Sequence, residues 1–145
     1  MLSSLAQDND TTGAADGRTD VITFAKGLPG FEACRQFVLR ATDNSALQCL
    51  SSIEGPEASF LAIDPRRVLD GYRCQLTDAD RVQLGAGEHE DETLLWLALL
   101  MAEPTGEVTV NLRAPVVINP RTMSGQQVIP FQCIYPLRHQ LLGVE

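Results

Sequence analysis

The most regular pattern in the chain is Val108-Thr109-Val110-Asn111-Leu112-Arg113-Ala114. Apolar residues occupy its even-numbered positions, and polar residues lie between them. A period of two over a stretch of this length is typical of a β-strand with one buried face. Val116-Val117-Ile118 continues the strand after Pro115, which predicts a bend or a sheet edge at the proline.

Other short apolar segments on both sides of this stretch also indicate strands. They lie between turn residues, at positions 21–24, 36–40, 46–52, 59–63 and 72–76. A turn at 119–125 and a return strand at 127–135 complete the set, and Pro130 predicts an edge or a bulge within that return strand. Strands at such short spacing predict a β-sandwich or a β-barrel.

Two segments between residues 77 and 102 depart from the strand pattern. Thr77, followed by Asp78 and Asp80, predicts the start of a short helix that two nearby glycines would end. Residues 93–102 are rich in Leu, Ala and Met, which by propensity favours a helix. The same unbroken apolar run fits a strand buried on both faces, so the residues alone leave both possibilities open.

The length and the charge limit the class of protein. The chain has 145 residues and a formal net charge of −8 at pH 7. About two thirds of the surface of such a chain is buried on folding, which fits one domain, and we assign residues 21–145 to it. Residues 1–20 are polar and poor in large side chains, which predicts a flexible tail.

The charge, the length of the apolar runs and the first residues predict the class of partner and the cellular location. Acidic charge argues against direct binding of nucleic acid and suits a basic partner. The longest apolar run, residues 94–102, is far shorter than the roughly 20 residues that a membrane-spanning helix needs. The first residues have no secretory-signal pattern, which predicts a cytoplasmic location.

The residues give little sign of catalysis or of a cofactor. The four cysteines form no CxxC pair, and we interpret them as small buried hydrophobes. His89 lies among acidic residues and is a possible metal ligand, but a solvated acidic loop explains it more simply. No nucleophile motif or phosphate loop is present. We predict a non-enzymatic protein without metal or cofactor; the rival, a cysteine-dependent enzyme, requires a reactive thiol.

Acidity concentrates between residues 78 and 92. This window holds six acidic residues against one basic residue, Arg81. A solvated surface explains the cluster most simply, but the same charges could dock a basic protein. The candidate partner-binding residues are therefore Asp78, Asp80, Glu88, Glu90, Asp91 and Glu92.

Three stretches together resemble the signatures of the bacterial flagellar assembly factor family, FliW. The first is Phe24-Ala25-Lys26-Gly27-Leu28-Pro29-Gly30-Phe31, which is similar to F-x-x-G-[IL]-P-G-F. The second is Phe60-Leu61-Ala62-Ile63-Asp64-Pro65, followed by Tyr72. The third is Thr109-Val110-Asn111-Leu112-Arg113-Ala114-Pro115-Val116-Val117-Ile118-Asn119, which is similar to T-x-N-L-x-A-P-[IV]-V-I-N. Order and spacing agree from about residue 21 to residue 142.

The resemblance implies a mainly β fold: a small antiparallel β-barrel (pseudo-barrel) with one short helix. It therefore favours a strand over residues 93–102. We assign the motif residues mainly to the architecture of this barrel: Gly27, Leu28, Pro29, Gly30, Phe31, Asp64, Pro65, Asn111, Leu112, Ala114 and Pro115.

The resemblance also implies a function without catalysis. Members of the family are cytoplasmic proteins that bind flagellin and the translational regulator CsrA, a basic RNA-binding dimer that represses the flagellin message. Flagellin sequesters the assembly factor. When flagellin is exported, the freed factor binds CsrA away from its RNA-binding surface and relieves repression. We expect flagellin and a CsrA-type regulator as partners, and neither nucleic acid nor membrane.

An alternative from the residues alone is a small-ligand-binding β-barrel. It predicts a closed apolar pocket near Tyr72 and Trp96.

Overall fold

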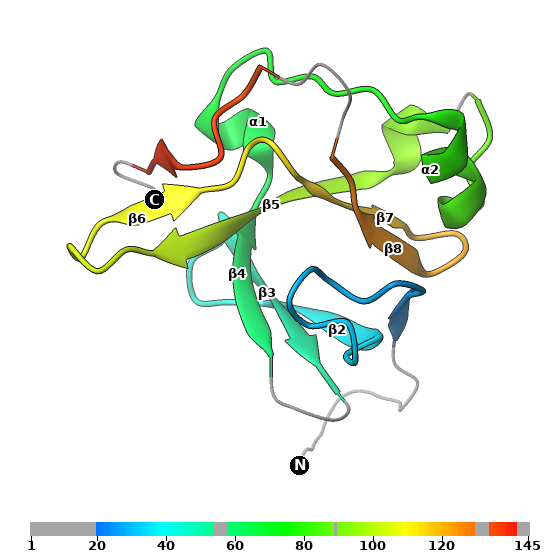
Figure 1. The fold of residues 1–145 in the computed structure, drawn as a ribbon, viewed down its shortest axis with the longest axis horizontal. Helices are drawn as coiled ribbons and strands as arrows, with labels where there is room; N and C mark the ends of the chain where they lie inside the picture. The colour runs from blue at the N-terminus through cyan, green and yellow to red at the C-terminus, as the bar shows by residue number, and fades with distance from the viewer. Residues whose placement is uncertain (1–19, 54–57, 89, 130–133, 142–145) are drawn as a thin grey trace.

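Seven β-strands close into a barrel in the computed structural model of the chain (Figure 1). The structure describes residues 20–53, 58–88, 90–129 and 134–141. The barrel consists, in order around it, of β1 (Ile22–Phe24), β2 (Gln36–Ala41), β3 (Leu47–Ser52), β4 (Ser59–Ile63), β5 (Leu95–Ala102), β7 (Val116–Asn119) and β8 (Ser124–Gln127). Beyond the barrel, β6 (Val108–Val110) pairs with β5, and β9 (His139–Gln140) pairs with β6.

The predicted fold class is confirmed, and two details differ from the expectation. The sheet is mixed, because β1 and β8 run parallel, with Thr23 opposite Ser124. Two short α-helices are present in the described residues, α1 (Pro65–Val68) and α2 (Asp78–Leu84), together with the 3₁₀ turn η1 (Asp91–Thr93). The expected tail falls almost entirely on residues 1–19, which lie outside the described residues.

Strand β5 resolves the ambiguity of the Leu-rich run in favour of a strand. Leu97 and Leu99 belong to the cluster inside the barrel, whereas Ala98 belongs to a second cluster on the opposite face of the strand. The strand is flanked by β4 on one edge and by β6 and β7 on the other. Because both faces are covered, the sequence is continuously apolar instead of alternating.

Aromatic rings fill much of the barrel interior. Phe24 and Phe37 are fully buried and meet edge to face, with their ring centroids 5.1 Å apart. The Phe24 ring lies directly over Gly125 of β8, where an added Cβ would come within 2.6 Å of the ring. Gly125 therefore leaves room for this ring on the inner face of the paired strands β1 and β8.

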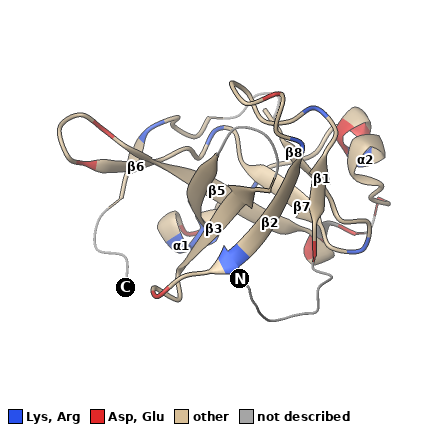
Figure 2. Ribbon diagram, turned by 90° about the horizontal axis from the view of Figure 1, so that it is seen from below, with Lys and Arg blue, Asp and Glu red and all other residues tan. Residues whose placement is uncertain are grey.

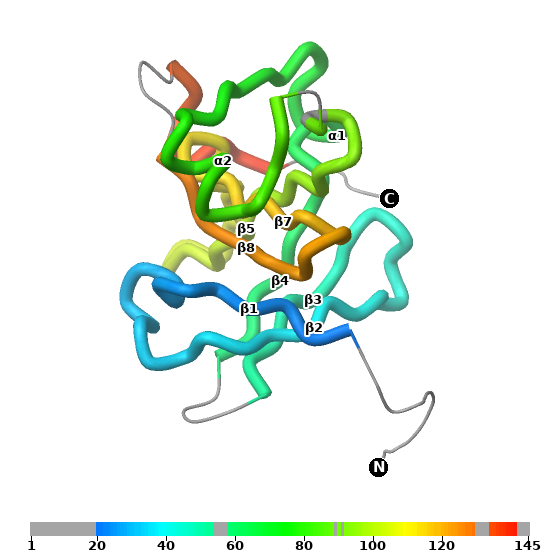
Figure 3. The backbone as a smooth tube through the Cα atoms, turned by 90° about the vertical axis from the view of Figure 1, so that its right-hand side faces the viewer, coloured from blue at the N-terminus to red at the C-terminus, as the bar shows by residue number. Residues whose placement is uncertain are grey.

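Helix α2 covers the outer face of the barrel beside β7 and β8, as the tube view from its side shows (Figure 3). Leu84 of the helix, Val117 of β7 and Val128 after β8 are all buried in one cluster. Strand β7 is thus buried on both faces, because its neighbouring side chains Val116 and Ile118 belong to the cluster inside the barrel.

The segment 72–76 has the predicted alternation of burial but is not a strand. Tyr72 and Leu76 are buried and Arg73 and Gln75 are exposed, yet the segment pairs with no strand of the described sheet. It runs between α1 and α2 over the outside of the barrel, so its inner side chains are buried without a ladder of hydrogen bonds.

The strand predicted over residues 108–114 ends early, at Val110. The side-chain oxygen of Asn111 accepts hydrogen bonds from the backbone N–H groups of Arg113 (3.1 Å) and Ala114 (3.0 Å). This turn takes the chain out of the ladder. Strand β7 then resumes beside residues 95–97 of β5, whereas β6 pairs with residues 100–102.

The return strand predicted over residues 127–135 is wrong in position. The observed strand β8 is Ser124–Gln127, the first half of which falls in the segment predicted to be a turn. Apart from Gly125 its side chains are polar, and pairing with β7 on one edge and β1 on the other holds the strand in place. Residues 130–133, with Pro130, lie outside the described residues.

Candidate partner-binding surface

The acidic window begins with a helix whose first turn is capped as the sequence predicts. The Thr77 hydroxyl accepts a hydrogen bond from the Asp80 N–H (3.0 Å), and the Asp80 carboxylate accepts one from the Thr77 N–H (3.2 Å). This reciprocal capping box satisfies backbone donors that the helix leaves open. Asp80 also accepts a hydrogen bond from Gln126 Nε2 at 2.8 Å, which fastens α2 to β8.

The other end of α2 is held by the turn between β7 and β8. Gly85 takes the left-handed conformation (φ 65°) that commonly ends a helix. The fully buried Asn119 donates a hydrogen bond through Nδ2 to the carbonyl oxygen of Leu84 at 2.9 Å, and Thr122 Oγ1 donates to the same oxygen at 2.9 Å. Side chains from the barrel thus donate hydrogen bonds to a carbonyl oxygen that has no donor within the helix.

Glu90 is bound into the same structure. Its carboxylate accepts hydrogen bonds from Arg121 Nε (2.9 Å) and Nη2 (3.1 Å) and from the Gly87 N–H (2.6 Å). The hydrogen bonds from Arg121, followed by that from Gly87, lower the pKa of Glu90 from its ordinary 4.5 to about 2. Arg121 Nη2 also donates to the Gly85 carbonyl oxygen at 2.6 Å.

The acidic cluster therefore divides into two groups. Asp80 and Glu90 bind donors of their own chain, whereas Asp78, Glu88 and Glu92 are exposed and form no ion pair within the described residues. Asp78 belongs to α2, on which Figure 2 shows acidic residues, whereas Glu88 follows the helix and Glu92 lies in η1. Val82, 81% exposed, adds an apolar side chain to this surface.

We call Asp78, Val82, Glu88 and Glu92 the acidic face. The backbone of Asp91 lies in η1, but its side chain is not described, and His89 lies outside the described residues.

The first sequence motif forms a tight connection between β1 and β2. Gly27 has a φ of 65°, and a Cβ there would lie 2.7 Å from the Cα of Glu32, so only glycine fits without a shift. Leu28 is buried and bridges to Phe31 across Pro29 and Gly30. The Phe31 ring meets the Phe60 ring edge to face at 5.2 Å, although Phe31 itself is 39% exposed.

The second motif starts α1. Asp64 caps this helix by accepting a hydrogen bond from the Arg66 N–H at 2.9 Å, and Pro65 occupies the first helical position. The carboxylate also pairs with the Arg66 guanidinium at 2.9 Å. Burial alone would raise the pKa of Asp64, but the hydrogen bonds from Arg66 outweigh it and lower that pKa.

The third motif turns the chain between β6 and β7. Besides the turn at Asn111, Leu112 is fully buried, and its carbonyl oxygen accepts a hydrogen bond from the Tyr72 hydroxyl at 2.7 Å. Ala114 is buried, and the carbonyl oxygen of Pro115 accepts a hydrogen bond from the Val128 N–H at 2.9 Å. All three motifs thus make contacts within the chain.

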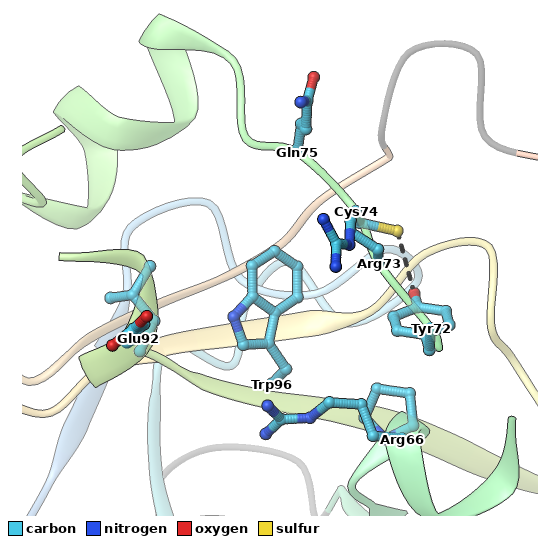
Figure 4. A pocket seen from close by; sticks show the side chains of 9 residues that line it. Arg66, Tyr72, Arg73, Cys74, Gln75, Glu92 and Trp96 are labelled. Carbon is cyan, nitrogen blue, oxygen red and sulfur yellow. Dashed lines mark hydrogen bonds between the residues drawn. The ribbon is translucent and has the colours of Figure 1, made fainter. Parts of the chain in front are cut away.

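A pocket of about 490 Å³ lies outside the barrel, beside α1 and the start of β5. Tyr72 and Trp96 line it, as the small-ligand alternative expects, but so do charged side chains, among them Arg66, Arg73 and Glu92 (Figure 4). The pocket is therefore of mixed polarity rather than the closed apolar cavity that this alternative requires.

The cysteines agree only in part with the prediction of buried hydrophobes. Cys34 is buried, whereas Cys49 and Cys74 are half-buried, and none of the three forms a disulfide within the described residues. Cys133 lies outside the described residues. None of the helices among the described residues is long and apolar enough to cross a membrane.

Sequence reasoning missed Arg121 and Asn119 as partners of the acidic window. Both lie about 30 residues away from it in the chain, in a segment that predicts only a turn. No pattern in the neighbouring sequence identifies Arg121 as the partner of Glu90, because the pairing depends on the packing of α2 against β7 and β8. Arg66 directly follows the second motif and Arg73 lies in the predicted strand 72–76, but neither pattern indicates that the two arginines line one pocket.

Comparison with known proteins places the whole domain in one family. The family model described as FliW protein matches residues 8–141, a match that begins inside the expected tail. The flagellar assembly factor FliW of Anoxybacillus flavithermus is 37% identical over 121 residues, which cover 83% of each chain. That of Geobacillus kaustophilus is 34% identical and covers 84% of each chain, and that of Clostridium botulinum is 32% identical and covers 87% of this chain and 88% of its own.

The fold agrees with these sequence matches. A crystal structure of the flagellar assembly factor FliW superposes with a TM-score of 0.77 at 30% identity, covering 88% of this chain and 89% of that one. The family consists of non-enzymatic assembly factors. The chain described here therefore belongs to the FliW family of flagellar assembly factors.

Proposed function

We propose that this protein binds flagellin and antagonises a CsrA-type translational regulator in the cytoplasm, so that flagellin synthesis follows flagellin export. Membership of an assembly-factor family makes flagellar proteins the expected partners. A factor of this kind acts by stoichiometric binding, which requires surfaces instead of a catalytic centre.

The observation that carries the proposal is the acidic face. Asp78, Glu88 and Glu92 have no ion-pair partner within the described residues, so their charges are available to a second protein. The exposed Val82 provides apolar area among them. Such a surface is complementary to a basic protein, and its charges would accelerate encounter as well as favour the correct orientation.

Because some acidic residues of the cluster bind within the chain and others do not, the test variants should change only the exposed ones. Removing Asp80 or Glu90 would disturb α2 and its attachment, so loss of binding in those variants would have two explanations. Asp78→Asn, Glu88→Gln and Glu92→Gln together remove charge without removing a described intramolecular bond. A matched control is Asp43→Asn, Asp70→Asn and Glu107→Gln, which removes the same charge from exposed positions elsewhere.

The test is isothermal titration of the full chain with the flagellin and the CsrA of its own organism, separately and in competition. We expect binding to both partners, with each excluding the other. The acidic-face variant should bind CsrA about tenfold more weakly at low salt, since exposed pairs contribute up to about 1 kcal/mol each. Its affinity should also depend less on salt than that of the wild type.

Three results would contradict the proposal in different ways. Binding to neither partner would remove it altogether. Simultaneous binding of both partners would remove the coupling of synthesis to export. Equal weakening in the acidic-face variant and the control would show that overall charge, and not this face, attracts the regulator.

A further inference from the structure

The pocket beside Trp96 lies apart from the barrel interior and brings together three segments of the chain. Pro65 and Arg66 come from α1, residues 72–75 from the connection to α2, and Glu92, Leu94 and Trp96 from η1 and the start of β5. Its volume of about 490 Å³ lies within the range of pockets that bind ligands.

Two arginines, Arg66 and Arg73, line this pocket together with Glu92. Arg66 is held in place because Asp64 accepts hydrogen bonds from its Nε (3.1 Å) and Nη2 (2.9 Å). These bonds use only two of the five N–H donors of a guanidinium, so the others remain for a ligand. The clamp thus fixes a cationic donor at the pocket wall before any ligand arrives.

Arg73 supplies a second guanidinium. Its backbone N–H donates to the Tyr135 hydroxyl at 2.9 Å, which anchors the residue. Its exposed guanidinium forms no hydrogen bond or ion pair within the part of the chain that the structure describes. Figure 4 shows the Arg66 and Arg73 side chains on opposite sides of the Trp96 ring in the view, with Glu92 beyond the edge that carries the indole nitrogen.

The apolar part of the pocket is Trp96, with Leu94 and Pro65. Trp96 is the only tryptophan of the chain and is half-buried. The pocket therefore places a tryptophan ring beside arginines. These two residue types are enriched at the centres of protein–protein interfaces, where they contribute most to affinity. Glu92 at the rim disfavours a ligand with several phosphate charges and tolerates one with a single carboxylate.

We infer that the Trp96 pocket binds a short acidic peptide segment of a protein partner, with a carboxylate on the guanidinium of Arg73 and a neighbouring aliphatic side chain on the indole. The carboxylate would form charge-assisted hydrogen bonds with Arg73, whose backbone is anchored by Tyr135, beside the cationic Arg66. The pocket shares Glu92 with the acidic face, but its arginines would select an acidic ligand, whereas the other exposed acids would select a basic one. It does not depend on which proteins the acidic face binds.

The test follows the indole Nε1–H resonance of Trp96 in the full chain by NMR, since one tryptophan gives one such signal. The probes are acetyl-Leu-Glu-Leu-amide, its neutral counterpart acetyl-Leu-Gln-Leu-amide, and AMP. We expect saturable shifts with the Glu peptide and about tenfold weaker binding of the Gln peptide, as loss of a hydrogen bond to a charged group predicts.

Arg73→Gln should reduce the affinity for the Glu peptide by about tenfold and leave that for the Gln peptide unchanged. The control is Arg67→Gln, which removes the same charge from an exposed residue of α1 that does not line the pocket. Three outcomes would overturn the inference: no shift up to the solubility limit of the peptide, equal affinity for the two peptides, or tighter binding of AMP than of the Glu peptide.

Discussion

Glu90 and Arg121 lie 31 positions apart in the chain and form a two-pronged ion pair, with Nε to Oε2 at 2.9 Å and Nη2 to Oε1 at 3.1 Å. The pair joins the loop after α2 to the turn between β7 and β8. It fixes the position of the acidic window on the barrel, so the exposed acids around Glu90 have a defined arrangement.

This ion pair predicts a component of stability that acid removes. The pKa of Glu90 is lower in the folded state, about 2, than its ordinary value of 4.5. A group of this kind stabilises the fold above pH 4.5, and its contribution is lost as the pH falls from about 4.5 to about 2. Glu90→Gln should therefore flatten the dependence of the unfolding free energy on pH within this window, as measured by urea titration at a series of pH values.

The control for this prediction is Glu88→Gln, which removes a nearby exposed charge but no described intramolecular bond. If Glu90→Gln and Glu88→Gln gave the same pH profile as the wild type, the ion pair would not contribute to stability in solution.

Asn119 is predicted to be one of the polar residues most sensitive to substitution. It is fully buried and donates to the Leu84 carbonyl oxygen. Asn119→Ala should cost about 1–3 kcal/mol, because it removes a buried donor and leaves its partners short of hydrogen bonds. Urea unfolding followed by circular dichroism measures this loss.

Asn119→Asp separates the two roles of this side chain. It keeps an oxygen to accept the hydrogen bond from the Arg121 N–H but removes the donor to Leu84. We expect it to be at least as destabilising as Asn119→Ala, and wild-type stability in this variant would refute the role assigned to the donor.

Gly125 should not tolerate even a methyl group. A Cβ at this position would lie 2.6 Å from Cζ of Phe24, a ring that has no free space because it is fully buried. Gly125→Ala should destabilise the barrel by about 1–3 kcal/mol through overpacking. Thermal unfolding compares it with Gly87→Ala, where the nearest atom outside the adjoining residues is 3.6 Å from the added carbon, so we expect little change there.

The two stacked tyrosines offer a matched pair of variants. The rings of Tyr72 and Tyr135 lie 4.4 Å apart, but only the Tyr72 hydroxyl makes a buried bond, to the Leu112 carbonyl oxygen. Tyr72→Phe should cost about 1–2 kcal/mol, whereas Tyr135→Phe, which removes a hydroxyl that accepts an exposed hydrogen bond, should cost less than about 1 kcal/mol. The reverse order in urea unfolding would contradict the assignment.

The sequence predicts strands well where burial follows the period of the backbone. Four strands from β1 to β4 fall within a residue of their expected positions, because each presents an alternating or short apolar pattern between turn residues. The run that becomes β5 is ambiguous by its residues alone. Its assignment as a strand depends on covering both faces, which is a property of the whole fold and not of the segment.

The errors share a physical cause. At Asn111 a side-chain hydrogen bond to the following backbone ends a strand whose apolar alternation continues. At Ser124–Gln127 the chain forms a strand with no apolar pattern, because its two neighbours supply the hydrogen-bonding partners. Such tertiary contacts override local preference, and the same holds for the pairing of Glu90 with Arg121.

The parallel contact between β1 and β8 has a consequence for how this protein is made. Thr23 and Ser124 are neighbours in the barrel but lie about a hundred residues apart in the chain. During synthesis the barrel cannot close until β8 has been made and has left the ribosome. A partner that recognises the closed barrel will therefore ignore nascent chains in which β8 is not yet available for pairing with β1.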